Sequence, residues 1–334
     1  MRLQRRWDVV ALRGAAAWLL LAWCPRAFAL NPALDVTQYA HTAWKIRDGF
    51  TKGEIRSIAQ TPDGYLWLGT EFGLLRFDGV RNVLWQPPAD AHLPSNGIVR
   101  LLASRDGTLW IGTVKGLARW KNGTLTQYAE FAGGLVTTLL EDRQGTVWAG
   151  MLKSPKGKLC AIRQGGVTCE GDGGEFGIGP FGLYEDAHAN LWAGVSTGLW
   201  RWRPGPPAFY SLPGEPNGIQ GFAEGDDGTL LISTHDGVRR LVGGNAHMAS
   251  PFPPALPSVQ AHKVLRDRDG GLWIGTSGWG LLHLHDGRTD VFTQTDGLSG
   301  DYIHALFEDR EHNIWVAHRT ASTAFGTPPS PRFP

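Results

Sequence analysis

The chain has almost no net charge and few of the residues that build long helices. Its 334 residues include 32 Lys and Arg against 31 Asp and Glu, a net charge of +1, and only 3 Met. Nucleic-acid binders usually carry a basic footprint, so nucleic acid is not an expected partner. The 45 Gly, 21 Pro and 15 Trp favour many short strands joined by tight turns. At this length we expect two domains or one large β architecture.

Long apolar runs are also missing. The longest, residues 14–23, is roughly half of the ~20 residues that a membrane span needs. Arg2, Arg5 and Arg6 precede it and Ala27-Phe28-Ala29 follows, the pattern of a cleaved secretory signal over residues 1–29. A membrane anchor is the weaker alternative, and lipidation of Cys24 is disfavoured because bulky Trp23 precedes it. We therefore expect a periplasmic chain with no membrane span after cleavage.

Only two cysteines remain beyond residue 29. Cys160 and Cys169 flank Gln164-Gly165, a two-residue turn that would close a hairpin and place the cysteines opposite each other. Directly opposite strand positions bring the Cβ atoms within reach of a bridge. The sequence predicts a disulfide in an oxidising compartment, with two buried free thiols as the alternative.

One short pattern, DGTLWIGT at residues 106–113, recurs along the chain. The copies place an aromatic or aliphatic residue about every 41 residues, a spacing typical of propeller blades. These residues are Trp67, Trp110, Trp148, Trp192, Leu231, Trp273 and Trp315. Two positions after each lies a small residue, and nine positions before each lies an apolar one. Since residues two apart share a strand face, we expect a ring from one sheet to fill the space above the glycine of its neighbour.

Each copy contains its own strands. In the first, strands are expected at residues 55–60, 65–70, 73–77 and about 83–86, separated by Asp-Gly turns. Four strands per repeat form one blade of a β-propeller. The chain is thus predicted to be all-β, a seven-bladed β-propeller over residues 30–317. A helical solenoid fits the Gly- and Trp-rich, strand-like units less well. A β-sandwich fits less well because it would not show one period seven times. The third blade is the least regular, with a loop lengthened over residues 151–158.

The pattern stops within the seventh copy. After residue 317 no Gly-Leu pair follows, so we expect the last blade to be incomplete and residues 318–334 to be irregular. Translated two nucleotides out of phase, residues 319–326 can spell DGLDRFR, which is repeat text. We hypothesise a frameshift in a longer gene, and the nucleotide sequence would decide it.

The repeats resemble the two-component regulator propeller family. The resemblance rests on residues 60–70, on 73–79, and on the lead-in at 41–44 with Asp48-Gly49. It implies a periplasmic sensor region of a hybrid histidine kinase or membrane diguanylate cyclase. Such a region binds a ligand, often a glycan fragment, and signals through an immunoglobulin-like domain and a membrane helix. We expect this chain to lack the membrane and output domains of such a sensor. A homodimer is expected if the chain is part of a longer sensor.

Catalytic and metal signatures are scarce. Asp267-Arg268-Asp269-Gly270 resembles the start of a calcium loop but lacks the downstream acidic ligand, so a turn explains it better. The histidines show no metal-ligand spacing within a strong motif, and residues 171–177 lack the context of a phosphate cradle. We expect no catalytic residues, no metal and no cofactor.

Binding residues are expected on the loops between the second and third strands, which share one face. The candidates are Glu71, Phe72, Lys115, His235, Asp236 and Trp279. They form a polar and aromatic set suited to a small molecule or a glycan, with Phe72 and Trp279 as stacking platforms. The alternative is that they are ordinary exposed loop residues. Two other functions stay open: an enzyme such as a lyase or hydrolase, with His235 and Asp236 as a weak candidate pair, and a protein-binding scaffold.

Overall fold

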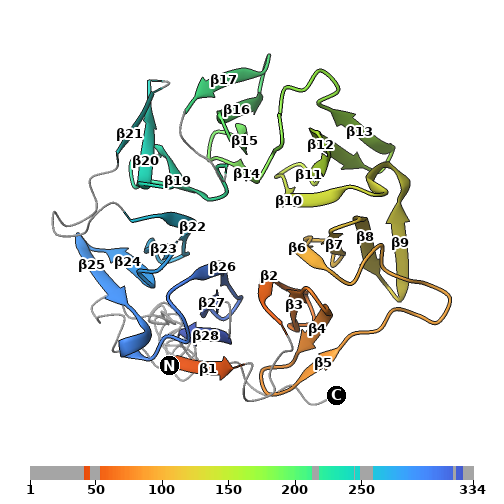
Figure 1. The fold of residues 1–334 in the computed structure, drawn as a ribbon, viewed down its shortest axis with the longest axis horizontal. Coiled ribbons are helices and arrows are strands. Elements are labelled where there is room, and N and C mark those ends of the chain that lie inside the picture. Colours follow the sequence, from red (N-terminus) through yellow and green to blue (C-terminus); the bar gives the residue numbers. More distant parts are fainter. Residues whose placement is uncertain are drawn as a thin grey trace, which may run out of the picture.

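The computed structural model describes residues 41–45, 53–212, 218–243, 245–248, 259–318 and 321–325. These residues form seven four-stranded antiparallel sheets arranged in a ring around a central channel (Figure 1). The predicted seven-bladed β-propeller is therefore confirmed. The expected signal peptide over residues 1–29 and Asp48-Gly49 lie outside the described residues. No helix among those residues is long and apolar enough to cross a membrane.

Each blade begins with its innermost strand and ends with its outermost one. Blade 1 contains β2 (Ile55–Gln60), β3 (Leu66–Thr70), β4 (Gly73–Phe77) and β5 (Asn82–Leu84). Blade 2 contains β6 (Ile98–Ala103), β7 (Leu109–Thr113), β8 (Gly116–Lys121) and β9 (Thr124–Tyr128). Blade 3 contains β10 (Leu135–Glu141), β11 (Val147–Lys153), β12 (Lys156–Arg163) and β13 (Gly166–Glu170).

The next three blades repeat this order. Blade 4 contains β14 (Gly182–Glu185), β15 (Leu191–Val195), β16 (Gly198–Arg203) and β17 (Ala208–Ser211). Blade 5 contains β18 (Phe222–Glu224), β19 (Leu230–Thr234), β20 (Gly237–Val242) and β21 (Asn245–Met248). Blade 6 contains β22 (Ala261–Arg266), β23 (Leu272–Thr276), β24 (Leu281–His285) and β25 (Arg288–Phe292). Short 3-10 turns lie at Ala129–Phe131 and Gln294–Asp296.

The ring closes in blade 7, where the two ends of the propeller meet. Its strands are β26 (Ile303–Glu308), β27 (Ile314–His318), β28 (Ala321–Phe325) and, outermost, β1 (His41–Lys45). The seventh copy alone thus supplies three strands, and the lead-in segment completes the blade. The prediction of an irregular segment from residue 318 is wrong for Ala321–Phe325, which pair with both β27 and β1. Pairing on both edges satisfies the backbone there, although the repeat text is missing.

The second strand of every blade is buried on both faces. In β3, β7, β15, β19, β23 and β27 all five residues are buried, since neighbouring sheets cover both sides. The space above the glycine of this strand is not filled by the kind of side chain that the sequence predicts. A Cβ added to Gly112 would lie 2.6 Å from Val136 Cγ1, and one on Gly275 would lie 2.6 Å from Ile303 Cγ2. An aliphatic side chain from the next innermost strand, and not a neighbouring ring, occupies the space.

Each tryptophan of the repeat is fixed by a hydrogen bond from its indole N–H. The acceptor lies six residues earlier, at Thr61, Ser104, Asp142, Asp186, Asp267 or Asp309. Asp267 accepts from Trp273 and from the backbone N–H of Gly271, so the segment that resembles a calcium loop is a turn. Burial raises the pKa of this carboxyl. The tryptophans therefore have a polar anchor as well as an apolar packing role.

Adjacent blades are joined by a second repeated hydrogen bond. The last residue of an innermost strand accepts from a backbone N–H in the first turn of the preceding blade. The observed pairs are Arg105 to Glu141, Arg143 to Glu185, Ala187 to Glu224, Arg268 to Glu308 and, across the ring closure, Arg310 to Gln60. These bonds lie on the face that carries the first turns, away from the loops predicted to bind ligand.

Blade 3 contains the disulfide. Cys160 in β12 and Cys169 in β13 are directly opposite, with Cα atoms 4.0 Å apart, and they are bonded as predicted. The residues 151–158 do not form the lengthened loop that the sequence suggests. They extend β11 and β12 instead, pairing as far as Lys153 with Lys156.

Candidate functional site

The loops between second and third strands are held by a threonine at the end of the second strand. The hydroxyl of Thr113 donates to the carbonyl of Gly116 at 2.8 Å and accepts from the N–H of Lys115 at 3.1 Å. Thr70, Thr234 and Thr276 make the same donor bond to Gly73, Gly237 and Gly280. Gly116 has φ +152°, which favours glycine. The loops are thus short, rigid platforms whose side chains are directed by the fold.

The blade 1 candidates lie beside the channel. Glu71 accepts from Arg56 of β2 at 3.4 Å. Phe72 is 56% exposed, and its ring covers Gly53, where an added Cβ would meet it at 2.6 Å. Phe72 therefore offers an aromatic surface next to a charged group at the start of the innermost strand.

Lys115 and Trp279 lie on loops of blades 2 and 6. Both are exposed, and Trp279 retains 43% of its accessible surface. Trp279 is anchored by its N–H to Thr276 Oγ1 at 3.0 Å. Four blades thus contribute the six predicted residues, so the structure distributes them around one face and does not gather them into one cluster. Their role in binding stays a prediction.

The structure separates the roles of His235 and Asp236. Asp236 accepts from Arg239 at 2.5 Å and from Thr234 Oγ1 at 2.8 Å. Partial burial opposes its ionisation, but the hydrogen bonds from Arg239 and Thr234 outweigh burial and lower its pKa. A carboxylate held in this way orders the loop and is poorly placed to act as a base. His235 is exposed and faces a pocket.

That pocket is small, lies between blades 5 and 6 and is open to solvent. It is lined by Gly218, Gln220, Ser233, Thr234, His235, Gln260, Ala261 and His262. Tyr302 from blade 7 adds a hydrogen bond of 2.9 Å between its hydroxyl and His262 Nε2. Burial, and then the charge of Lys263, lower the pKa of His262, which favours its neutral form. Neutral imidazole, two amides and hydroxyl groups can both donate to and accept from a polar ligand.

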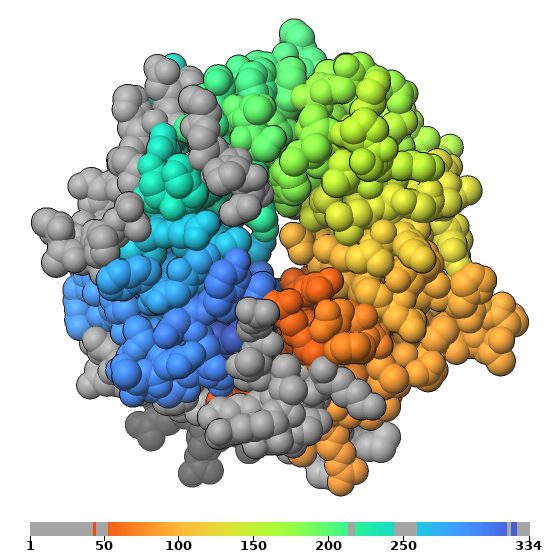
Figure 2. Space-filling model, viewed as in Figure 1, coloured from red at the N-terminus to blue at the C-terminus, as the bar shows by residue number. Residues whose placement is uncertain are grey.

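The pocket lies where the innermost strands β18 and β22 begin. Figure 2 shows an opening at the centre of the ring, between the innermost strands. Gln220 and His262 belong both to the pocket wall and to the segments that enter the innermost strands β18 and β22. Sequence reasoning missed Gln220, Gln260, His262 and Tyr302 because they lie at the start of the first strand of a blade and not on the loops considered. The repeat gives no signal for them, since the position of Gln220 and His262 is also polar in other blades, as Arg56 and His304.

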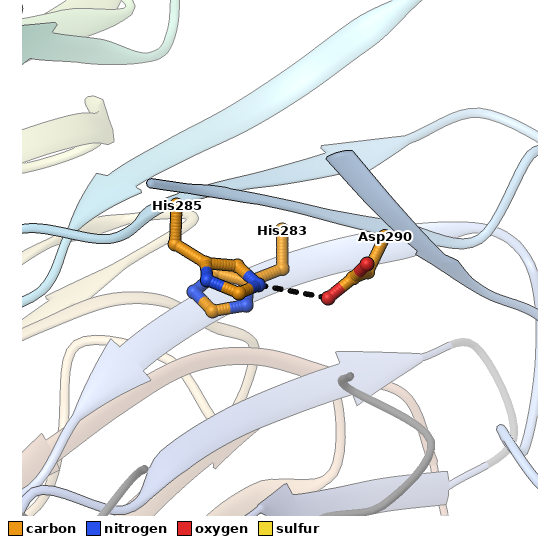
Figure 3. A group of neighbouring side chains, drawn as sticks. All are labelled: His283, His285 and Asp290. Atoms are coloured by element: carbon orange, nitrogen blue, oxygen red, sulfur yellow. Dashed lines mark hydrogen bonds and ion pairs between the residues drawn. The ribbon is translucent and has the colours of Figure 1, made fainter. Parts of the chain in front are cut away.

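A buried group of two histidines and an aspartate is the one metal candidate among the described residues. His283 and His285 project from one face of β24, and Asp290 lies opposite His283 on β25 (Figure 3). Their donor atoms lie within 4.8 Å of one another, and all three residues are buried. The sequence interpretation missed this His-x-His spacing, in which alternate strand residues share a face.

The geometry of this group suits a hydrogen-bonded stack better than a metal centre. His285 Nε2 lies 2.8 Å from Asp290 Oδ2, a direct hydrogen bond. The rings of His283 and His285 are stacked 4.4 Å apart at 22°, and His283 also stacks on Trp273 at 3.8 Å. Imidazole lone pairs lie in the ring plane, so two nearly parallel stacked rings do not converge on one ion at bonds of about 2 Å. One ring would have to leave the stack to bind a metal.

The fold defines the class of protein: a β-propeller, a ring of repeated four-stranded blades. The sequence profile of the family described as "Two component regulator propeller" matches residues 49–72, 92–115, 255–278 and 297–320. The predicted resemblance is thereby confirmed, and blades 1, 2, 6 and 7 carry the repeat of that family. A comparison with the curated proteins found no match.

Solved structures share the fold. The extracellular domain assigned to the hybrid two component system BT3049 from B. thetaiotaomicron has a TM-score of 0.71 at 18% identity, over 86% of this chain and 42% of that one. The corresponding domain of BT4673 from the same organism has a TM-score of 0.66 at 18% identity, over 84% and 38%. The chain thus spans less than half the length of each of these two extracellular domains. Virginiamycin B lyase from Staphylococcus aureus also matches, at 0.66 and 14% identity, over 87% and 100%.

Proposed function

We propose that this chain is the ligand-binding propeller of an extracytoplasmic sensor in bacterial signal transduction, and that it has no catalytic activity of its own. The observation that carries the proposal is the polar pocket at the start of the innermost strands β18 and β22, in a propeller of which four blades match the regulator family. Phe72 and Trp279 lie exposed on the same face and suit stacking against sugar rings. The ligand class proposed is a glycan or another polar small molecule.

The test is ligand binding by the purified chain. We would screen oligosaccharides by thermal shift and titrate the hits by calorimetry, in wild type and in His235→Ala and Gln260→Ala. Each variant removes one polar wall residue of the pocket, and loss of a hydrogen bond to ligand should weaken binding roughly 3- to 10-fold. Gln144→Ala, an exposed change on the opposite face, is the matched control. If the pocket variants bind every hit as well as wild type, the pocket is not the site.

A propeller enzyme is the second candidate, because a lyase shares this fold. The only acid–base pair suggested by the sequence was His235 with Asp236, and Asp236 is engaged by Arg239 and Thr234. This engagement favours binding without turnover. Incubating each ligand with the protein and following it by mass spectrometry checks the point, since any cleavage or elimination product that is lost in His235→Ala would favour the enzyme.

The proposed location and assembly need separate tests. A periplasmic chain should reach the periplasm in cell fractionation and should begin after residue 29 by N-terminal mass spectrometry. A homodimer should form when a longer sensor containing this propeller is examined by light scattering. A protein partner recovered by pull-down, with no small-molecule binding, would favour the scaffold function instead.

A further inference from the structure

Two innermost strands carry long basic side chains at one position of the repeat. This position lies ten residues before the conserved aromatic, and it is occupied by Ser57, Arg100, Thr138, Gly182, Gly221, Lys263 and Ala305. Five of the seven are small. Arg100 of β6 and Lys263 of β22 are the exceptions, and these strands face each other across the channel (Figure 1).

A third basic residue, Arg56, lies at a β-bulge in the innermost strand of blade 1. The register of β2 with β3 shifts between Ile55 and Ser57, so Arg56 is a bulged residue. A bulge changes the direction in which nearby side chains point. The innermost strands β6 and β22 have the same register shift directly before Arg100 and Lys263. We call Arg56, Arg100 and Lys263 the channel cations.

The channel cations act on one another electrostatically. Burial, and then the charge of Arg56, lower the pKa of Arg100 to about 10. Burial, and then the charge of Arg100, lower the pKa of Lys263 to about 7. All three side chains are half-buried, so protein surrounds much of each group while part of it stays in contact with solvent. Like charges in such surroundings repel each other more than they would in bulk water.

The two cations that face across the channel have weak partners. Arg100 Nη1 donates to the carbonyl of its neighbour Val99 at 2.9 Å, and Lys263 Nζ donates to Gln220 Oε1 at 3.2 Å. Among the described residues, no carboxylate forms an ion pair with Arg100 or Lys263, whereas Arg56 is paired with Glu54 and Glu71. Incompletely solvated cations without a counter-charge cost free energy, and an anion between them would recover it.

We propose that the channel holds an anion-binding site, in which a carboxylate, sulfate or phosphate group lies between Arg100 and Lys263 with Arg56 beside them. In the intact sensor this group belongs to the sensed ligand, so the ligand class narrows to acidic molecules such as glycans with uronate or sulfate substituents. That last step rests on the proposed function, whereas the anion site itself does not.

The first arm of the test uses inorganic sulfate. Thermal and urea unfolding of the full chain would be measured with sodium sulfate and with sodium chloride at equal ionic strength. Sulfate should stabilise wild type more than chloride does, because a ligand that binds only the folded state stabilises it. The apparent affinity for sulfate follows from this extra stabilisation. In Lys263→Met and Arg100→Gln that affinity should fall at least about tenfold.

The variants also have a signature that simple damage would not produce. Lys263→Met removes an uncompensated charge, so without sulfate it should be at least as stable as wild type. Lys153→Met, an exposed change at the end of β11, is the control and should respond to sulfate as wild type does. Equal sulfate stabilisation of wild type and Lys263→Met, or no extra stabilisation of wild type, would overturn the anion site.

The second arm separates the anion site from the sensor function. Calorimetry would compare a galacturonate oligomer with a neutral galactose oligomer of the same length. Binding of the acidic oligomer alone, lost in Lys263→Met, supports the acidic ligand class. Binding of the neutral oligomer alone overturns that class while leaving the sensor function intact. Sulfate binding without any binding of oligomers supports the anion site and counts against a glycan as the ligand.

Discussion

Ile98, at the start of the innermost strand of blade 2, lies directly against Gly69 in the second strand of blade 1. A Cβ added to Gly69 would lie 2.7 Å from Ile98 Cγ2. The same contact recurs from Gly112 to Val136 and from Gly275 to Ile303. The small position of the repeat thus sets the spacing between blades, because a larger residue would push the next innermost strand away.

Gly69→Ala should therefore destabilise the fold by about 1–3 kcal/mol, through overpacking of a well-filled interface. In the background Ile98→Ala the added methyl would keep only a 3.2 Å contact with the Cβ of residue 98. The double variant should then be more stable than the sum of the single changes predicts. Urea unfolding measures all three, with Gly165→Ala, where an added Cβ meets nothing within 4 Å, as control. Simple additivity would contradict the contact.

Ring closure should depend on Trp44 of β1. Its ring stacks on Trp315 at 5.0 Å and meets the ring of Phe77 edge-on at 5.4 Å, so it joins blade 7 to blade 1. Trp44→Ala should cost about 2 kcal/mol, less than a fully buried tryptophan because Trp44 is half-buried. Trp279→Ala, which removes an exposed ring, should change the unfolding free energy by less than about 0.5 kcal/mol. Equal effects of the two changes would show that β1 contributes little to closure.

Stability should fall between pH 6.5 and pH 4 because of His318. Burial lowers the pKa of this histidine from 6.5 to about 4, so the folded state keeps it neutral while the unfolded state binds a proton in this window. The unfolded state then binds more protons, and stability decreases as pH falls, by up to about 3 kcal/mol. His318→Gln should flatten the pH dependence of urea unfolding. The same change at exposed His188 should leave it unaltered, and an unchanged slope in His318→Gln would refute the assignment.

Zinc should not stabilise the protein through His283, His285 and Asp290. The stacked rings and the direct 2.8 Å bond between His285 and Asp290 leave no converging ligand set. We expect the midpoint of thermal unfolding to be the same with Zn²⁺ and with EDTA. His285→Ala should still destabilise by about 1–3 kcal/mol, since it removes a hydrogen bond between buried groups. A zinc-dependent increase in wild type that His285→Ala abolishes would establish a metal site instead.

Much of the architecture could be predicted because the repeat is local. The recurrence of the tryptophan with its small neighbour identifies a strand and its period, and period and strand count together imply blades. The disulfide followed from hairpin register, which depends only on the turn at Gln164-Gly165 and strand alternation. Within each blade, neighbouring strands are joined by short turns, so sequence order fixes which strands pair.

The features that sequence reasoning missed join residues far apart in the chain. β1 pairs with β28, at opposite ends of the propeller, and no local pattern indicates this pairing. Gln220, His262 and Tyr302 meet because three innermost strands begin side by side at the channel mouth. Likewise, sequence reasoning did not relate His283 to Asp290, which the pairing of β24 with β25 places opposite each other.

The sequence by itself determined the seven-fold repeat, the strand order within blades and the position of the disulfide, since each depends on residues within one blade. Only the tertiary structure decided how the ring closes, what fills the space above each glycine, and which side chains share the channel. Those outcomes depend on the curvature of the ring, which places β6 and β22, the innermost strands of Arg100 and Lys263, on opposite sides of the channel.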